Sequence, residues 1–239
     1  MNTPDKECIA VIGIACRFPG ASNYQQYWEN LTQGVDSVSQ IPPDRWDWRT
    51  YWGDSRTEKN KSNSRWGGFI QDADKFDAAF FGISPREAEN MDPQQRLMLE
   101  LSWLCLEDSG YAPFDLSGRS VGVFIGTFNY DYKELQTKYG QRIEGHSATG
   151  TSPAIIANRI SYFFDFHGPS IPVDTACSSS LVAVHRGIEA IKSGKCELVV
   201  AGGINTLLAQ EFQISLSKAG MLSQDGRCRT FDKGANGYA

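Results

Sequence analysis

Four short hydrophobic runs, rich in β-branched residues, alternate with helical segments along this chain of 239 residues. The runs are apolar almost throughout rather than at every second position, which is typical of parallel strands buried on both faces. Parallel neighbours need crossover connections, and helices between them supply these, so the alternation predicts an α/β fold with a mainly parallel sheet. The predicted strands are Ile9–Cys16, Ser120–Gly126, Ser170–Ala176 and Glu197–Gly203.

Residues that favour helix ends lie between these runs. Ser84 is followed by Pro85 and Glu87, in the order of an N-cap, a first helical position and a capping-box acid. Asp92 and the proline after it begin a helix that ends before Gly110, and its apolar residues on nearly all sides predict a buried helix. Further helices are predicted from Pro153 onward, over residues 178–193 and over residues 207–218, whereas the aperiodic residues 37–69 are predicted to form a long surface excursion.

Composition excludes several classes of function. The net charge of -5 and the pI near 5.3 are not those of a nucleic-acid-binding domain. No apolar run reaches the roughly 18 residues that a membrane span needs, and the N-terminal stretch lacks the layout of a signal peptide. The six cysteines form no C-x-x-C pair, so we expect neither a metal site nor a disulfide framework, and we predict a cytoplasmic protein. These cysteines are Cys8, Cys16, Cys105, Cys177, Cys196 and Cys228.

Cys177 has sequence neighbours that are typical of a catalytic nucleophile. In VDTACSSSLVAVH, residues 173–185, Cys177 lies where a predicted strand turns into a predicted helix. A helix N-terminus favours a thiolate, and its backbone N–H groups can hold a developing oxyanion. A sharp strand–turn–helix nucleophile also needs small neighbours, which Ala176, Ser178 and Ser179 provide. A buried structural thiol is the competing interpretation of the same residues, because cysteine is often simply a small hydrophobic residue.

The three histidines are the most obvious candidates for a general base. His185 lies eight residues after Cys177 on the predicted helix, which separates the two Cα atoms by roughly 12 Å, beyond hydrogen-bond reach of the thiol. His167 falls in a predicted turn and His146 in a predicted loop. We expect all three to be structural, and no Cys–His pair can be assigned from the sequence.

Four other features have a functional and a structural interpretation. Asp174 is either a catalytic acid or an anchor of the turn, and the second is favoured for a residue at the end of a strand. GHSATGTS (145–152) echoes a phosphate-binding loop, but Thr151 replaces the lysine that would contact the phosphates. The tryptophans of DRWDW (44–48) either stack on a ligand or pack within a surface loop. Residues 74–84 are expected to contribute core packing.

Several stretches resemble one enzyme family. VDTACSSSLVAVH is similar to the active-site signature of the β-ketoacyl synthases, or ketosynthases, of type I polyketide synthases. The resemblance continues in order through nearly the whole chain. It includes IAVIGIACRFPGA (9–21), FFGISPREAENMDPQQRLMLELSWLCLEDSGY (80–111), GVFIGT (122–127), ANRISYFFDFHGPS (157–170) and AGGIN (201–205). DRWDWRTYWGD and NKSNSRWGGFI most resemble synthases whose acyltransferase acts in trans.

The resemblance implies a thiolase-like, condensing-enzyme fold. In that family, two related halves form a duplicated α/β/α architecture, usually as a homodimer, and residues 1–239 match the N-terminal half. It also implies that Cys177 is the catalytic nucleophile and that its N–H is one oxyanion-hole donor. The substrates would be carried on the phosphopantetheine arm of an acyl carrier protein, with no cofactor bound to the chain. Residues 145–152 would approach the acyl pocket and the dimer contact.

The family's two catalytic histidines lie in stretches resembling HGTGT and NIGH, and neither stretch occurs here. We therefore expect that this chain alone does not complete a condensation and associates with a complementary C-terminal half. Two alternatives remain at this point. The chain could be a ketosynthase-like scaffold that docks a carrier protein without turnover, or a cysteine-dependent acyltransferase that passes an acyl group to another thiol.

Overall fold

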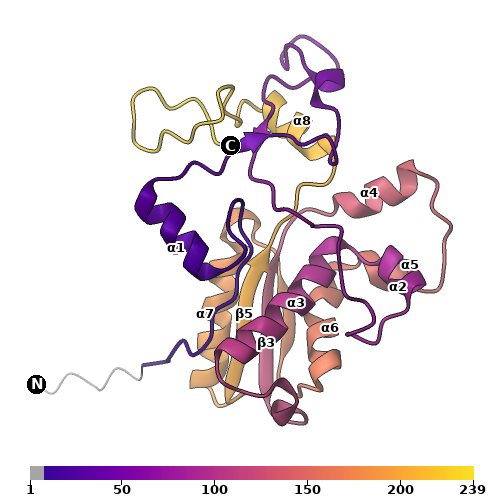
Figure 1. Ribbon diagram of the computed structural model, residues 1–239, viewed down its shortest axis with the longest axis vertical. Coiled ribbons are helices and arrows are strands. Elements are labelled where there is room, and N and C mark those ends of the chain that lie inside the picture. The colour runs from indigo at the N-terminus through magenta and orange to yellow at the C-terminus, as the bar shows by residue number, and fades with distance from the viewer. Residues whose placement is uncertain (1–7) are drawn as a thin grey trace, which may run out of the picture. The chain divides into compact units, whose positions relative to one another are not determined.

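The computed structural model describes residues 8–239 (Figure 1). These residues form two compact units. Residues 1–7, part of the stretch that we inspected for a signal peptide, lie outside the described residues. The first unit, called the sheet unit below, consists of residues 8–15, Gln95–Phe128 and Ser152–Ile204. The second unit consists of Cys16–Gln94, Asn129–Thr151 and Asn205–Ala239.

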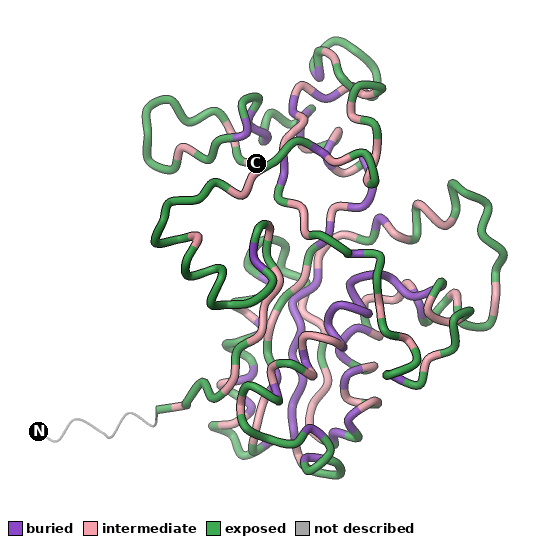
Figure 2. Tube along the Cα trace, viewed as in Figure 1, coloured by how far each residue is buried: buried purple, intermediate pink, exposed green. Residues whose placement is uncertain are grey.

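A parallel three-stranded sheet forms the centre of the sheet unit. Its order is β4-β3-β5, with β3 at Val121–Thr127, β4 at Ser170–Val173 and β5 at Leu198–Ile204. Val123 of β3 pairs with Ser170 on one side and with Val200 on the other. Every residue of the central strand β3 is buried (Figure 2), as a continuous apolar run predicts for a strand covered on both faces. Three of the four predicted strands and the parallel sheet are therefore confirmed.

Helices cover the two faces of this sheet. Helix α7 (Ser179–Lys192) packs against β3 and β5, and Phe124, Ala183 and Ala190 form a buried cluster between them. On the opposite face of β5, Gly202 approaches Met98 of helix α3 (Pro93–Asp108). Helix α6 (Pro153–Phe164) joins α3 through the stacked rings of Trp103 and Phe164, whose centroids are 6.1 Å apart. The result is the three-layered α/β/α arrangement expected from the sequence.

The helix boundaries follow the capping residues closely. Ser84 Oγ accepts a hydrogen bond from the Glu87 N–H at the start of α2 (Pro85–Asn90), and Asp92 Oδ1 accepts from the Gln94 N–H at the start of α3. Helix α3 is buried over its first turns, but Leu104 near its end is half exposed. The prediction of a helix buried on nearly all sides is therefore right only for its N-terminal part. Within residues 8–239, no helix combines the length and the apolar character needed to cross a bilayer.

The predicted strand Ile9–Cys16 is wrong, because none of these residues has strand structure. Val11 is 80% exposed, and Ile12 and Ile14 are also exposed. The Ile14 N–H donates to Asp108 Oδ2 at the end of α3, at 2.8 Å. A side-chain carboxylate thus accepts the hydrogen bond that a neighbouring strand would otherwise accept from Ile14. The hydrophobic content of the run does not distinguish these two cases.

The second unit contains short elements joined by long connections. An antiparallel pair is formed by β1 (Ser39–Gln40) and β2 (Trp66–Gly67). The helices are α1 (Tyr24–Gln33), α2, α4 (Asp131–Lys138), α5 (Ser147–Thr151) and α8 (Gln210–Lys218), with the 3-10 turn η1 at Trp48–Tyr51. A second 3-10 turn, η2 (Pro113–Leu116), belongs to the sheet unit.

Two sequence-based expectations for the second unit need correction. Residues 37–69 are not simply a surface excursion, because Ser55, Ser62 and Ser64 are buried and Ser64 Oγ donates to the Ser223 carbonyl at 2.8 Å. Helix α8 begins at Gln210 rather than at residue 207. The N–H groups of residues 208 and 209 donate instead to the carboxylate of Asp131, which holds this stretch extended before the helix starts.

Candidate active site

Cys177 is exposed and lies in a tight turn between β4 and α7 of the sheet unit. Strand β4 ends at Val173, three residues earlier than predicted. A 3-10 turn, η3 (Ala176–Ser178), carries the cysteine, and α7 begins two residues after it. The predicted strand–turn–helix arrangement is present, and the competing interpretation of Cys177 as a buried thiol is wrong.

The backbone of this turn is strained next to the thiol. Ala176 has a φ of +55°, a left-handed conformation that an L-residue other than glycine adopts at a cost of about 1–2 kcal/mol. Its N–H donates to Asp174 Oδ1 at 3.1 Å, which helps to hold that conformation. The expectation that Asp174 anchors the turn is therefore confirmed. Strain of this kind persists only where surrounding contacts over-determine it.

Serine and threonine side chains supply further contacts within the turn. Ser179 Oγ accepts a hydrogen bond from the Thr175 N–H at 2.8 Å and donates to the Ala176 carbonyl at 2.7 Å. Ser178 Oγ donates to the Thr175 carbonyl, also at 2.8 Å. The small residues around Cys177 thus do more than leave room, because their hydroxyls close the turn.

Two glycines let the start of α7 approach the sheet closely. A Cβ added at Gly126 of β3 would lie 2.6 Å from the Ser179 carbonyl carbon and 2.6 Å from the Ser180 nitrogen. A Cβ added at Gly203 of β5 would lie 2.5 Å from the Ser180 Cβ. Sequence analysis missed these two positions, although a glycine inside a strand often marks a close backbone approach.

The N-terminus of the helix that follows lies beside the turn. Helix α7 has 14 residues, and no side chain caps its N-terminus. Its first N–H groups and the aligned peptide dipoles therefore place partial positive charge near Cys177. This field favours an oxyanion that develops on a bound carbonyl group.

The other cysteines differ from Cys177 in burial or in setting. Burial raises the pKa of Cys16, Cys105 and Cys196, which disfavours their thiolate forms. Cys8 and Cys228 are exposed, but neither lies at a strand–helix turn. Of the three exposed thiols, Cys177 alone combines accessibility with a helix N-terminus.

Each of the three histidine rings lies near a carboxylate. His185 Nε2 lies 3.5 Å from Glu189 Oε1 on the same helix, and His167 Nε2 lies 3.0 Å from Asp165 Oδ1. His146 Nδ1 lies 3.9 Å from a carboxylate oxygen of Glu87. All three rings are exposed, and none of these contacts involves Cys177.

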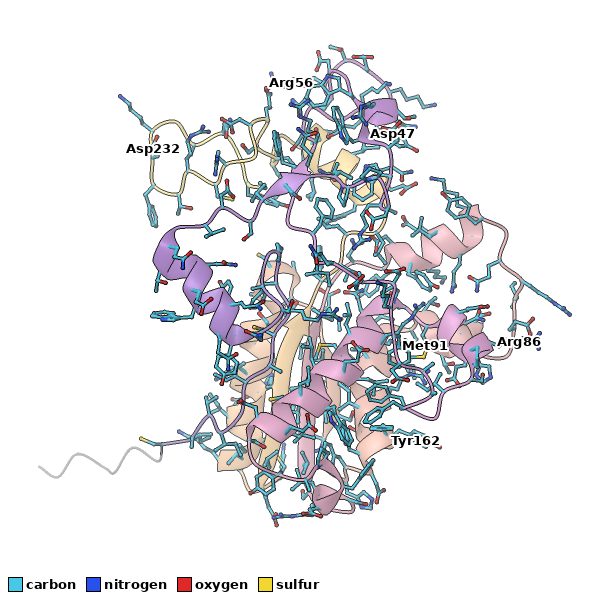
Figure 3. The ribbon with its side chains drawn as sticks, in the orientation of Figure 1. Asp47, Arg56, Arg86, Met91, Tyr162 and Asp232 are labelled. Atoms are coloured by element: carbon cyan, nitrogen blue, oxygen red, sulfur yellow. The ribbon has the colours of Figure 1, made fainter. Side chains whose placement is uncertain are left out.

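The other sequence candidates take part in packing. Thr151 ends the five-residue helix α5, whose Gly150 accepts a hydrogen bond from the Asp92 N–H at 2.8 Å. The ring of Trp48 is covered by the guanidinium groups of Arg49 and Arg65, each 4.9 Å from its centroid. The carboxylate of Asp47 (Figure 3) accepts from the Arg49 N–H and caps η1.

Phe81 is buried in the second unit and stacks on Phe76, with centroids 5.2 Å apart. Phe80 meets Phe81 edge to face but remains half exposed, so core packing around residues 74–84 is confirmed for Phe81 and wrong for Phe80. In the part of the chain that the structure describes, no group of three or more His, Cys, Asp or Glu side chains is arranged to hold a metal ion.

Comparison with known proteins adds independent findings. A family model described as "Beta-ketoacyl synthase, N-terminal domain" matches residues 6–239. The chain is 53% identical to polyketide synthase PksN of Bacillus subtilis over 98% of its own length, and 51% identical to polyketide synthase ThaG of Burkholderia thailandensis over 96%. It spans only 4% of the length of each of these two proteins.

Solved structures show the same relationship. The oxazolomycin ketosynthase domain OzmH KS7 of Streptomyces albus JA3453 superposes with a TM-score of 0.89 and 43% identity. The match covers 96% of this chain and 40% of that one. The ketosynthase from module 6 of the bacillaene synthase of Bacillus subtilis 168 superposes with a TM-score of 0.83 and 37% identity, over 95% of this chain and 37% of that one.

Proposed function

This chain belongs to the β-ketoacyl synthase family, whose N-terminal domain it matches, and we propose on this basis that Cys177 is a nucleophile. Cys177 would accept an acyl group from a thioester. The Cys177 thiolate would attack the thioester carbonyl, and the oxyanion would form beside the N-terminus of α7. Collapse of the intermediate would break the bond to the departing thiol. The acyl group would remain on Cys177 Sγ, and the departing thiolate would take up a proton from water.

One observation carries this proposal. The exposed Cys177 follows a left-handed alanine and precedes an uncapped helix of 14 residues. A thiol that only filled space would need neither the strained Ala176 nor exposure to solvent. An acyl-accepting thiol needs access for the thioester and a field that favours its ionised form.

The wider reaction follows from the family. We propose that Cys177 works within a ketosynthase of the trans-acyltransferase type. There, the acyl group on Cys177 would be joined to a malonyl-type extender as carbon dioxide leaves. One carbon–carbon bond would form, while the bond from the extender to its departing carboxylate and the bond from the acyl group to Cys177 Sγ would both break, which frees the thiolate to take up a proton. The acyl carrier protein would present both substrates on phosphopantetheine arms. A homodimer in the cytoplasm is the assembly and location that we propose.

The acyl-transfer step can be tested on the 239-residue chain by intact-protein mass spectrometry. The chain would be incubated with an acyl-pantetheine thioester, in parallel with Cys177→Ala and Cys228→Ala variants. Cys228 is also exposed but lies outside any strand–helix turn, so its variant controls for general thiol reactivity. We expect one acyl adduct on the native chain and on Cys228→Ala, and none on Cys177→Ala. An adduct that persists in Cys177→Ala would reject the assignment. No adduct on the native chain would favour the scaffold.

A further inference from the structure

We propose that Ser179 is a positioning residue whose hydroxyl holds the Cys177 turn in its reactive conformation. The inference rests on the proposed function of Cys177, and it concerns a side chain two residues further along the chain. Ser179 would not contact the acyl group or the departing thiol. It would act through the backbone of Thr175 and Ala176, with which its hydroxyl forms hydrogen bonds.

The hydroxyl of Ser179 is buried and fully used. Ser179 is 5% exposed, and its oxygen both accepts from the Thr175 N–H at 2.8 Å and donates to the Ala176 carbonyl at 2.7 Å. The Ser179 N–H also donates to the Ala176 carbonyl. One side chain therefore fixes the two residues that precede Cys177, including the residue with a φ of +55°.

The position of Ser179 is itself set by the sheet. Its carbonyl carbon and oxygen would lie only 2.6 Å and 2.9 Å from a Cβ added at Gly126, so the backbone of Ser179 lies directly on β3. Because β3 is buried along its whole length, this support is firm. Ser179 thus connects the sheet to the turn, because its backbone lies against β3 and its hydroxyl holds the turn.

Ser178 provides a matched control within the same turn. Its hydroxyl also contacts Thr175, at 2.8 Å to the carbonyl and 2.9 Å to Oγ1, but these contacts do not involve Ala176. Ser178 is exposed, whereas Ser179 is buried. Water can replace the exposed Ser178 hydroxyl, whereas loss of the buried Ser179 hydroxyl removes both the acceptor of the Thr175 N–H and the donor to the Ala176 carbonyl.

The consequence concerns Ala176 rather than the helix as a whole. Without the Ser179 hydroxyl, the turn can relax from the left-handed conformation to a more favourable one, and Cys177 moves away from the field of α7. A glycine at position 176 adopts positive φ without steric cost. It should therefore make the turn independent of Ser179.

The test measures the rate of Cys177 alkylation by iodoacetamide as a function of pH, with quantification of the Cys177 peptide. For Ser179→Ala, we expect the rate at neutral pH to fall about tenfold. Ser178→Ala should stay within about twofold of the native rate. The double variant Ala176→Gly/Ser179→Ala should recover most of the native rate, which a general loss of stability would not explain.

A second pair covers the case in which Ser179→Ala does not fold. Ser179→Thr and Ser179→Val have nearly the same shape, and only the first retains a hydroxyl, so the rate should be higher in the Thr variant. Native alkylation in Ser179→Ala, a double variant that stays slow, or equal rates in the Thr and Val variants would each overturn the inference. Acyl loading of the native chain is measured separately. If loading fails while alkylation follows this pattern, the proposed function is wrong but the role of Ser179 stands.

Discussion

Replacement of Gly203 by alanine tests how closely the start of α7 must approach the sheet. The added Cβ would lie 2.5 Å from the Ser180 Cβ, far inside normal contact distance, and 3.2 Å from its Cα, which is also a tight contact. Overpacking of this kind typically destabilises a protein by about 1–3 kcal/mol. The first turn of α7 would have to move away from β5, and the turn that carries Cys177 would move with it.

Gly202 offers a matched control, because it is the adjacent residue on the same strand and faces the opposite side. A Cβ there would meet only Met98 Cε, at an ordinary 3.9 Å. Both substitutions reduce the conformational freedom of the unfolded chain equally, which should stabilise the folded protein by about 0.5–1 kcal/mol in each variant. The difference between Gly203→Ala and Gly202→Ala therefore isolates the packing cost of about 1–3 kcal/mol.

Thermal unfolding and iodoacetamide labelling provide the two readouts. For a chain of this size, 1 kcal/mol corresponds to about 2–4 °C, so Gly203→Ala should melt roughly 2–12 °C below Gly202→Ala. Alkylation of Cys177 should slow in Gly203→Ala and stay native in Gly202→Ala. Equal melting temperatures together with equal labelling rates would refute the argument that Gly203 seats α7 on the sheet.

Three further predictions concern other residues. Burial raises the pKa of Asp131, so its protonated form is favoured in the folded state. The stability that it contributes is present below the unfolded pKa and is lost as pH rises through the higher folded pKa. The free energy of unfolding of the native chain, measured relative to Asp131→Asn by urea titration, should therefore fall as the pH rises above about 4, and a rise would contradict this. Ser64→Ala removes a buried hydrogen bond to the Ser223 carbonyl and should lower the free energy of unfolding by about 1–3 kcal/mol, whereas a value unchanged in the same titration would argue against that contact. Under limiting iodoacetamide, peptide mapping should find Cys196 labelled later than Cys177, because burial raises the pKa of Cys196, and the reverse order would count against the site.

The elements that could be predicted from the sequence depend on residues that lie close together in the chain. The strands β3, β4 and β5 were predictable because each is a short, nearly continuous apolar run, although only β3 is buried along its whole length. The starts of α2 and α3 were predictable because Ser84 and Asp92 satisfy N–H groups within the same turn. The turn at Cys177 was predictable because small residues must stand where a strand bends into a helix.

The remaining features depend on partners far apart in the chain. The apolar run before Cys16 carries the composition of a strand, but its backbone bonds to a carboxylate about ninety residues away, as Ile14 does to Asp108. The start of α8 is delayed by Asp131, which no local pattern reveals. The left-handed Ala176 was not predictable either, because alanine does not mark positive φ as glycine does.

Tyr162 shows the same limit on the surface of the sheet unit. It belongs to the apolar run of α6, yet its ring projects away from the helix and is 88% exposed (Figure 3). Its neighbours Phe163 and Phe164 instead pack with Trp103. Helical spacing predicts which of these aromatic side chains is buried and which is exposed only when the position of the partner helix is known.

Mapping the position of the acyl group decides whether Cys177 is the acyl acceptor. The chain would be incubated with an acyl-pantetheine thioester, digested under conditions that preserve thioesters, and analysed by peptide mass spectrometry for all six cysteines. We predict that the acyl group is found on the peptide containing Cys177, with the exposed Cys8 and Cys228 unmodified. An acyl group on Cys8 or Cys228, with Cys177 unmodified, would contradict the account.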